Sequence, residues 1–217
     1  RIMAYTNIDD PSAYFQAKTY TGNATDNTAI TNDGNSNLQA DWIWFKRRSS
    51  VENHVLADST RGVTKWLFSN LNDAEGTSTA RLKSFDTNGF TLGDTGSTNQ
   101  NGGTFVAWQW KCNGGTTSSN TDGNITSTVQ SNQDAGFSIV TYTGNGSANQ
   151  TIGHGLGAVP KMILFKNRSN AAYWYVYHIE TGNDTMTYLN LTNAAQSLSS
   201  QFSTPTTTTF NVSNENS

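Results

Sequence analysis

The clearest shortage in this sequence is charge. Charged residues make up 13% of the 217 residues, about half of the ~25% found in ordinary globular chains. The net charge is −3 and no basic stripe is present, so we expect no phosphate-binding surface and no nucleic-acid partner. Thr, Ser and Asn supply the polar surface instead, and these residues suit strands and turns.

Cysteine and long apolar runs are also scarce. Cys112 is the single cysteine, so no disulfide can form within the chain, and we expect its thiol to pack as a small buried group. No stretch of 18 or more apolar residues occurs, so we expect no membrane insertion.

The sequence lacks the familiar motifs of catalysis. It contains no G-x-S-x-G, no H-E-x-x-H and no P-loop lysine motif, and the three histidines, His54, His154 and His178, are scattered. Its Asn-Asp-Gly clusters lack the closing glutamate of an EF-hand loop and are typical of tight turns. We therefore expect a protein that is not an enzyme, with no cofactor and no metal site.

Aromatic residues and internal repetition are what the sequence has in quantity. Aromatics make up 11% of the chain, and the pentapeptide TYTGN occurs at 19–23 and again at 141–145. Beyond a short gap, Phe45 and Phe165 match at an offset of 120 residues, and Phe90 and Phe210 keep that offset. A constant offset over such a length predicts a tandem repeat.

The repeat predicts the domain organisation. We expect an N-terminal arm over 1–12, a first repeat over 13–112, a linker rich in Gly, Ser and Thr over 113–135, and a second repeat over 136–217. The strand predicted at 104–112 has no counterpart in the second repeat, because that counterpart would lie beyond Ser217. We expect either that the sequence is a fragment or that another chain supplies this strand.

Short alternating segments with turn signals predict an all-β fold of two tandem antiparallel β-sandwiches, jelly-roll or lectin-like, the second lacking its final strand. DWIWFK (41–46) and KMILFK (161–166) are continuous apolar runs, which predict central strands buried on both faces. Alternation places Trp42 and Trp44 on one face of the first run. It likewise places Trp108 and Trp110 on one face of the segment FVAWQWK (105–111).

Aromatic side chains beside predicted loops are the candidate binding residues. Trp66, Tyr173, Trp174 and Tyr175 have this position, and a flat aromatic face can stack on a sugar ring while its polar rim makes one hydrogen bond. The competing interpretation is that these rings pack inside the sandwich cores.

Several longer segments carry a resemblance to a known group of proteins. They are IDDPSAYFQAKTYTGN, ADWIWFKRRS, ADSTRG, SFDTNGFTLG, FVAWQWK, GFSIVTYTGNG, IGHGLGAVPKMILFKNRS and YLNLTNAA. Together they resemble a family of uncharacterised tandem-repeat proteins of marine bacteriophages and uncultured viruses. The resemblance implies virion structural or tail-fibre-like proteins built from lectin-like β-sandwiches, and it implies no catalytic residues.

From these observations we expect a phage virion structural protein, namely a tail fibre, an appendage or a capsid decoration. It would assemble in the cytoplasm of a bacterial host and reside in the virion. Its expected partners are other virion proteins, a host cell-surface glycan and further copies of itself in a homo-oligomer. The alternatives are a carbohydrate-binding module of a secreted protein and, less favoured, a polysaccharide hydrolase.

Overall fold

The computed structural model describes residues 8–183, 185–197 and 203–212. The structure is all-β, and its strands form antiparallel sheets as the sequence predicted. The chain divides into two compact units, which we call unit 1 (described residues 8–67 and 76–115) and unit 2 (described residues 68–75 and 116–212). No helix in the described part is long and apolar enough to cross a membrane.

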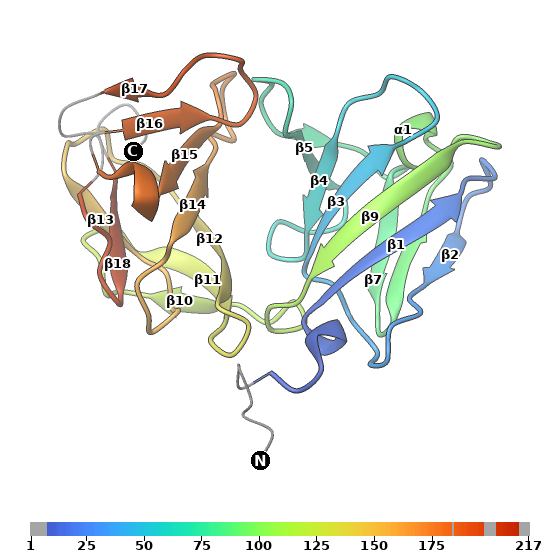
Figure 1. Ribbon diagram of the computed structural model, residues 1–217, viewed down its shortest axis with the longest axis horizontal. Helices are drawn as coiled ribbons and strands as arrows, with labels where there is room; N and C mark the ends of the chain where they lie inside the picture. Colours follow the sequence, from blue (N-terminus) through green and yellow to red (C-terminus); the bar gives the residue numbers. More distant parts are fainter. Residues whose placement is uncertain (1–7, 184, 198–202, 213–217) are drawn as a thin grey trace. The chain divides into compact units, whose positions relative to one another are not determined.

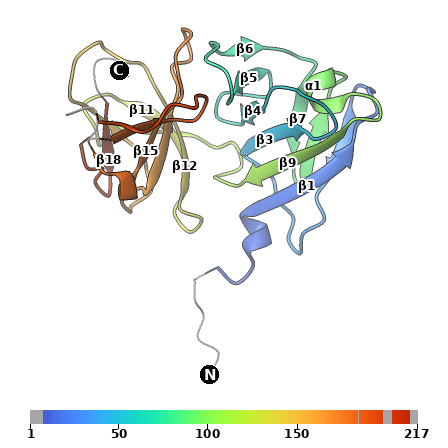
Figure 2. The same cartoon turned by 45° about the horizontal axis from the view of Figure 1, so that its top comes forward.

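Unit 1 contains a six-stranded sheet in the order β1-β9-β3-β4-β5-β6 and a three-stranded sheet in the order β2-β8-β7 (Figure 1). The strand β9 pairs antiparallel with both β1 and β3, and Figure 2 shows the three side by side. The elements are η1 (Pro11–Ala13), β1 (Phe15–Thr21), β2 (Thr28–Thr31), β3 (Trp42–Arg47), β4 (Val55–Asp58), β5 (Lys65–Phe68), β6 (Gly76–Thr77), β7 (Leu82–Asp86), β8 (Gly89–Leu92), α1 (Gly96–Asn99) and β9 (Thr104–Trp110).

The core of unit 1 lies between these two sheets. Phe45 of β3 meets Phe90 of β8 edge-on, with ring centroids 5.2 Å apart. Ile43 is 0% exposed, whereas Trp42 and Trp44, on the opposite face of β3, are only half-buried. The prediction that this central strand is buried on both faces is therefore wrong, because the second sheet covers one face alone.

A buried carboxylate fixes the end of β9. Asp41, immediately before β3, is fully buried and accepts hydrogen bonds from the backbone N–H groups of Cys112, Gly114 and Gly115 at 2.6, 3.0 and 2.8 Å. The hydroxyl of Ser59 donates a fourth bond at 2.7 Å. Four donors on one carboxylate compensate the cost of burying its charge, so Asp41 ties the segment that follows β9 to the start of β3.

Unit 2 contains a three-stranded sheet in the order β10-β11-β12, a four-stranded sheet β14-β15-β16-β17 and the pair β13-β18. These strands pair antiparallel with their neighbours. The elements are β10 (Ser118–Asn120), β11 (Ser127–Asn132), β12 (Phe137–Tyr142), β13 (Gln150–Gly153), β14 (Met162–Phe165), β15 (Tyr175–His178), η2 (Ile179–Thr181), β16 (Thr185–Tyr188), β17 (Gln196–Ser197) and β18 (Thr209–Val212).

The composition of residues 113–135 predicts a linker, but part of this range forms strands. It contains β10 and β11, and β11 pairs with β12 over its whole length, with Val129 opposite Val140. Val129 and Ile125 are buried. Val129 is the only aliphatic residue of β11, so the backbone pairing with β12, more than an apolar pattern of its own, places this strand in the sheet.

The core of unit 2 joins strands from all three sheets. Ile152 of β13, Phe165 of β14, Tyr177 of β15 and Phe210 of β18 belong to one buried cluster, and Val140 of β12 packs against it. The phenylalanine rings of β14 and β18 meet edge-on at 5.4 Å. Unit 2 thus has its own hydrophobic core, whereas the two-repeat organisation over 13–112 and 136–217 stays a prediction from the sequence.

Candidate functional site

The outer face of the six-stranded sheet of unit 1 carries a cluster of tryptophans. Trp42 and Trp44 of β3 lie directly opposite Trp110 and Trp108 of β9 in the strand register. All four side chains are half-buried. We call these four residues the tryptophan face. They share one face because residues two apart on a strand point the same way.

The rings of the tryptophan face contact one another in a continuous array. Ring centroids are 4.7 Å apart between Trp42 and Trp110, 6.0 Å between Trp42 and Trp44, and 6.2 Å between Trp44 and Trp108. The interplanar angles range from 38° to 75°, which are the tilted and edge-on arrangements that indoles prefer. Mutual packing therefore holds the rings in fixed orientations.

The array borders an open hollow of about 330 Å³, lined by Trp44, His54, Trp108 and Trp110. This volume is at the lower end of the range of small-molecule sites, and such sites are lined mainly by aromatic and apolar side chains with few polar groups. The hollow thus offers aromatic surface and one imidazole to a ligand of modest size.

His54 supplies the polar rim of the hollow. Its Nδ1 accepts a hydrogen bond from Nε1 of Trp44 at 3.3 Å. Burial, and to a lesser degree the positive charge of Lys46, lowers the pKa of His54 below its ordinary value. The imidazole is therefore neutral at pH 7, which is the state in which Nδ1 can accept the indole proton.

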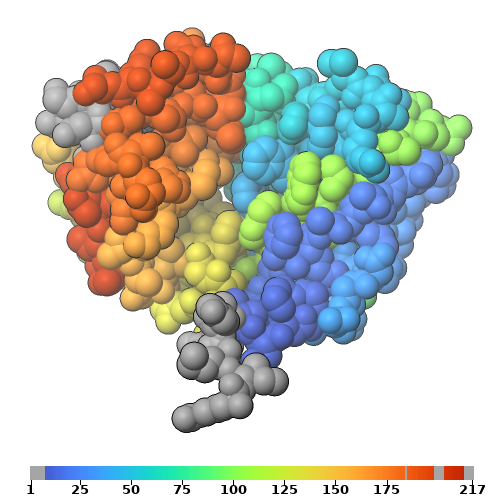
Figure 3. Space-filling view, in the orientation of Figure 1, coloured from blue at the N-terminus to red at the C-terminus, as the bar shows by residue number. Residues whose placement is uncertain are grey.

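The tryptophan face continues toward the edge of the sheet. Phe15 of β1 is 40% exposed, and its ring centroid lies 4.9 Å from that of Trp110. In Figure 3 the green atoms of β9 reach the surface of unit 1 between the blue atoms of β1 and the cyan atoms of β3. Aromatic surface from three adjacent strands is thus accessible on this side of unit 1.

Trp66, one of the four binding residues expected from the sequence, lies elsewhere in unit 1. The guanidinium carbon of Arg81 lies 4.4 Å from the centroid of its ring. Gly76 also lies against this ring, since a Cβ atom there would be 2.0 Å from the indole. Trp66 is half-buried, and these contacts describe a packed ring with a cation over it.

The other three expected residues lie in unit 2. Tyr173 is 42% exposed, and Tyr175 is half-buried; both pack on Tyr188, each with ring centroids 5.5 Å apart. Trp174 is 5% exposed, and its Nε1 donates to the carbonyl of Phe68 at 2.8 Å. The indole of Trp174 therefore packs inside unit 2, and glycan stacking by these residues stays a prediction.

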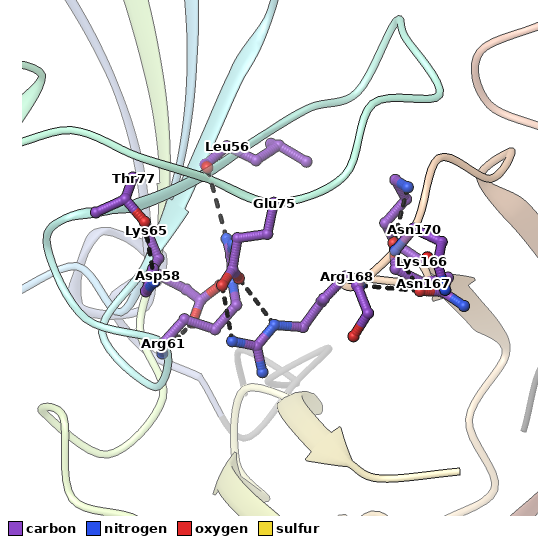
Figure 4. Close-up of polar contacts among 11 residues, drawn as sticks. Leu56, Asp58, Arg61, Lys65, Glu75, Thr77, Lys166, Asn167, Arg168 and Asn170 are labelled. Atoms are coloured by element: carbon purple, nitrogen blue, oxygen red, sulfur yellow. Dashed lines mark hydrogen bonds and ion pairs between the residues drawn. The ribbon is translucent and has the colours of Figure 1, made fainter.

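Trp174 packs against a segment that comes from far earlier in the chain. Residues 68–75 belong to unit 2, and Arg168 binds the carboxylate of Glu75 through two parallel bonds of 2.8 and 2.9 Å (Figure 4). The amide of Glu75 also donates to the carbonyl of Arg168 at 2.9 Å. Figure 4 also shows the buried pair of Asp58 and Arg61 in unit 1. We infer that both ion pairs stabilise the fold and do not form part of a binding site.

The tryptophan face was missed as a candidate although its signal was present in the sequence. The alternation that pairs Trp42 with Trp44, and Trp108 with Trp110, was visible in the two segments. What the sequence did not show was that these segments are neighbouring strands, and that the second sheet covers their other faces. Register between strands far apart in the chain is a tertiary property, which alternation within a segment does not reveal.

No group of three or more His, Cys, Asp or Glu side chains that could hold a metal ion occurs among the described residues. Among known proteins, one family model matches residues 10–217, and its description is "Domain of unknown function (DUF7483)". No curated protein and no solved structure matches the chain.

Proposed function

The chain belongs to the DUF7483 family, and we propose that it is an adhesive protein that binds a glycan through the tryptophan face of unit 1. The observation that carries this proposal is the set of four indoles on two adjacent strands, Trp42, Trp44, Trp108 and Trp110, packed against one another and left half-buried. Large apolar side chains that gather at an accessible face mark binding surfaces more often than isolated ones do.

The ligand chemistry follows from the rings. One face of a pyranose presents C–H groups, and an indole attracts them through its electron-rich ring, while the sugar hydroxyls at the rim remain in water or meet a polar group. The neutral imidazole of His54 stands at this rim. A charged ligand would instead need compensating charge, and the lining of the hollow contains no acidic or basic side chain other than this histidine.

The setting of this adhesive function is the virion, as the resemblance of the sequence implies. A single open hollow offers modest affinity, and many copies on one particle would raise the overall affinity by multivalency. A carbohydrate-binding module of a secreted protein is the second candidate, because the same tryptophan face supports it. Imaging of intact particles with an antibody against the chain distinguishes these settings.

The binding test uses the whole chain on an array of bacterial surface polysaccharides. We expect at least one glycan to bind, and we expect Trp44→Ala or Trp108→Ala to weaken binding about tenfold, equivalent to about 1.4 kcal/mol. Tyr173→Ala is the matched control, since Tyr173 is exposed but lies in unit 2. Thermal denaturation of each variant confirms that it is folded.

Two results would contradict the proposal. One is a folded chain that binds no glycan on a broad array. The other is a glycan whose binding survives Trp44→Ala and Trp108→Ala and is lost with Tyr173→Ala, which would move the site to the residues that the sequence had favoured.

A further inference from the structure

Four asparagines of this chain are followed directly by glycine, and such a pair can react with itself. The four are Asn88, Asn101, Asn113 and Asn145. In the reaction the backbone nitrogen of the glycine attacks Cγ of the asparagine and closes a five-membered ring. Glycine favours this step because it has no Cβ to crowd the ring and restricts the backbone least. The four sites share this local chemistry, so the fold decides which of them reacts.

Hydrogen bonding distinguishes the four glycine amides. Three of them each donate a bond of 2.9 to 3.0 Å, two to backbone carbonyls and one to the carboxylate of Asp41; they are the amides of Gly89, Gly102 and Gly114. An amide must give up its proton before its nitrogen can attack, so these bonds have to break first. The amide of Gly146 makes no hydrogen bond within the part of the chain that the structure describes.

Solvent access to the reacting groups is also required, because water or hydroxide accepts the amide proton. Asn145 and Gly146 are both exposed. Apart from the chain neighbours of Gly146, no atom lies within 4 Å of the position that a Cβ atom on it would take. Asn101 and Asn113 are exposed as well, so exposure alone does not select one site. The amide without a hydrogen bond does.

The side chain of Asn145 is folded back over the backbone that follows it. Its Oδ1 accepts a hydrogen bond from the amide of Ser147 at 3.0 Å, and its Nδ2 donates to Oε1 of Gln150 at 3.1 Å. The first bond is the local turn that asparagine commonly forms with the residue two positions on. The same N–H group faces the oxygen on which negative charge develops when Cγ is attacked, and it therefore favours the attack.

The other copy of TYTGN provides an internal comparison. Oδ1 of Asn23 accepts a hydrogen bond from the amide of Thr25 at 2.9 Å, which is the same turn. The next residue, however, is Ala24, and its amide donates to the carbonyl of Asn99 at 2.8 Å. The backbone is left-handed in both copies, with φ of 54° at Ala24 and 71° at Gly146. The two turns thus differ in the residue after asparagine and in the hydrogen bond of its amide.

We infer that Asn145 is a site of spontaneous deamidation and that, of the four asparagines followed by glycine, it reacts first in the folded chain. Water or hydroxide takes the proton from the amide of Gly146, and the nitrogen forms a bond to Cγ of Asn145. The bond between Cγ and Nδ2 breaks, and Nδ2 takes a proton from water and leaves as ammonia. Water then opens the resulting succinimide at either of its carbonyls, which gives aspartate or isoaspartate without any change in oxidation state.

The reaction changes the loop between β12 and β13. A carboxylate replaces a neutral amide, so the formal net charge of the chain goes from −3 to −4. The hydrogen bond that Nδ2 donates to Gln150 is lost, because an ionised carboxylate only accepts. Isoaspartate also adds one methylene group to the main chain. The fraction of molecules with an altered loop therefore increases with time after synthesis.

The test follows the folded whole chain in mildly alkaline buffer. Digestion with pepsin at acid pH and mass spectrometry detect the replacement of NH2 by OH at each asparagine. We expect Asn145 to deamidate at least about tenfold faster than the other three, since breaking one amide hydrogen bond slows attack by about that factor. In denaturant these bonds are absent, and we expect the four rates to agree within about threefold.

Two variants separate the glycine from the state of its amide. Gly146→Ala keeps the turn, because Ala24 has the same left-handed backbone in the other copy, and we expect deamidation of Asn145 to slow at least about tenfold. Ala24→Gly places glycine after Asn23 but leaves the amide bonded to Asn99. We expect Asn23 in this variant to remain at least about tenfold slower than Asn145. If Gly146→Ala does not fold, Ala24→Gly and the rates in denaturant decide the question.

Four results would overturn the inference. They are an unmodified Asn145 in the folded chain, a rate at Asn101 or Asn113 equal to that at Asn145, a folded Gly146→Ala variant that deamidates at the original rate, or a rate at Asn23 in Ala24→Gly equal to that at Asn145. None of these results bears on glycan binding by the tryptophan face, because Asn145 lies in unit 2.

Discussion

The six-stranded sheet of unit 1 contains both β1 and β3, whereas in the described part of unit 2 the strands β12 and β14, which carry the matching phenylalanines Phe137 and Phe165, belong to two different sheets. The pairs β2–β8 and β13–β18, by contrast, form in both units with matching register. Short strand pairs of this kind thus form in both units. What changes is burial: Ile43 is 0% exposed, whereas Ile163 is half-buried. The comparison teaches that an inward-facing isoleucine is enclosed more fully in the middle of a large sheet than in a strand at the end of a sheet.

The two units also differ at the residue that precedes the first central strand. Unit 1 has Asp41, whose carboxylate accepts three backbone N–H bonds from the segment after β9. Unit 2 has Lys161 at the corresponding position. A lysine side chain cannot accept hydrogen bonds, so Lys161 cannot hold a following segment in the way that Asp41 does.

The largest effect expected from breaking this comparison comes from truncating the paired isoleucines. Ile43→Ala should lower the free energy of unfolding of unit 1 by about 4 kcal/mol, because it leaves a cavity in an enclosed core. Ile163→Ala should cost about half as much, since its site is partly open. Calorimetry with hydrogen exchange resolved by unit measures both, and equal losses would contradict the difference in enclosure.

Removing the buried carboxylate should have the next largest effect. In Asp41→Asn an NH2 group replaces one acceptor oxygen and faces backbone donors, so we expect unit 1 to lose about 3 kcal/mol. Lys161→Asn is the matched control in unit 2 and should change stability by less than about 0.5 kcal/mol. Exchange at residues 104–112 should rise in Asp41→Asn alone, and a similar rise in both variants would show that the anchor is not specific to unit 1.

The smallest expected effect is the pH dependence of stability that arises from one histidine in each unit. Burial lowers the pKa of His54 in unit 1 and of His154 in unit 2 below the ordinary value of 6.5. Stability from a neutral buried histidine is complete above pH 6.5 and is lost as the pH falls through and below that value. His54→Phe should therefore reduce the acid sensitivity of the melting temperature of unit 1 and leave that of unit 2 unchanged.

This histidine effect is separable from that of the carboxylates. Hydrogen bonds from Ser12 and Ser36 lower the pKa of Asp10 from 3.8, and Lys18 lowers that of Asp33. Their contributions decline only as the pH falls below 3.8, so a scan from about pH 8 to about pH 5 isolates the histidines. An unchanged acid response in His54→Phe would contradict the assignment.

Much of the fold could be predicted because the signals that specify it are local. The apolar runs at 41–46 and 161–166 and the alternation within 104–112 predicted strands, and β3, β14 and β9 lie there. The strand β11 was harder to predict, because Ser, Gln and Asn fill most of it and Val129 is its single aliphatic residue. Its place in the sheet comes from pairing with β12, which is a non-local contact.

The binding residues were less predictable than the fold, because exposure depends on which faces meet. Trp174 lies beside a loop in sequence, yet segment 68–75 covers its indole and accepts its N–H proton. Trp44 lies inside an apolar run, yet its ring lines a hollow, because the three-stranded sheet of unit 1 covers the opposite face of β3. Hydrophobicity predicts that aromatic rings prefer burial, but it does not predict which rings are buried by another segment of the chain.

Five of the six tryptophans of this chain lie in unit 1, and four of these indoles form the tryptophan face. Centroid separations of 4.7 to 6.2 Å are short enough for their electronic transitions to couple. Unit 1 should therefore give an exciton couplet in circular dichroism, which disappears when β3 and β9 separate. The protein thus carries its own optical reporter of one strand pair, and melting of unit 2 leaves that signal unchanged.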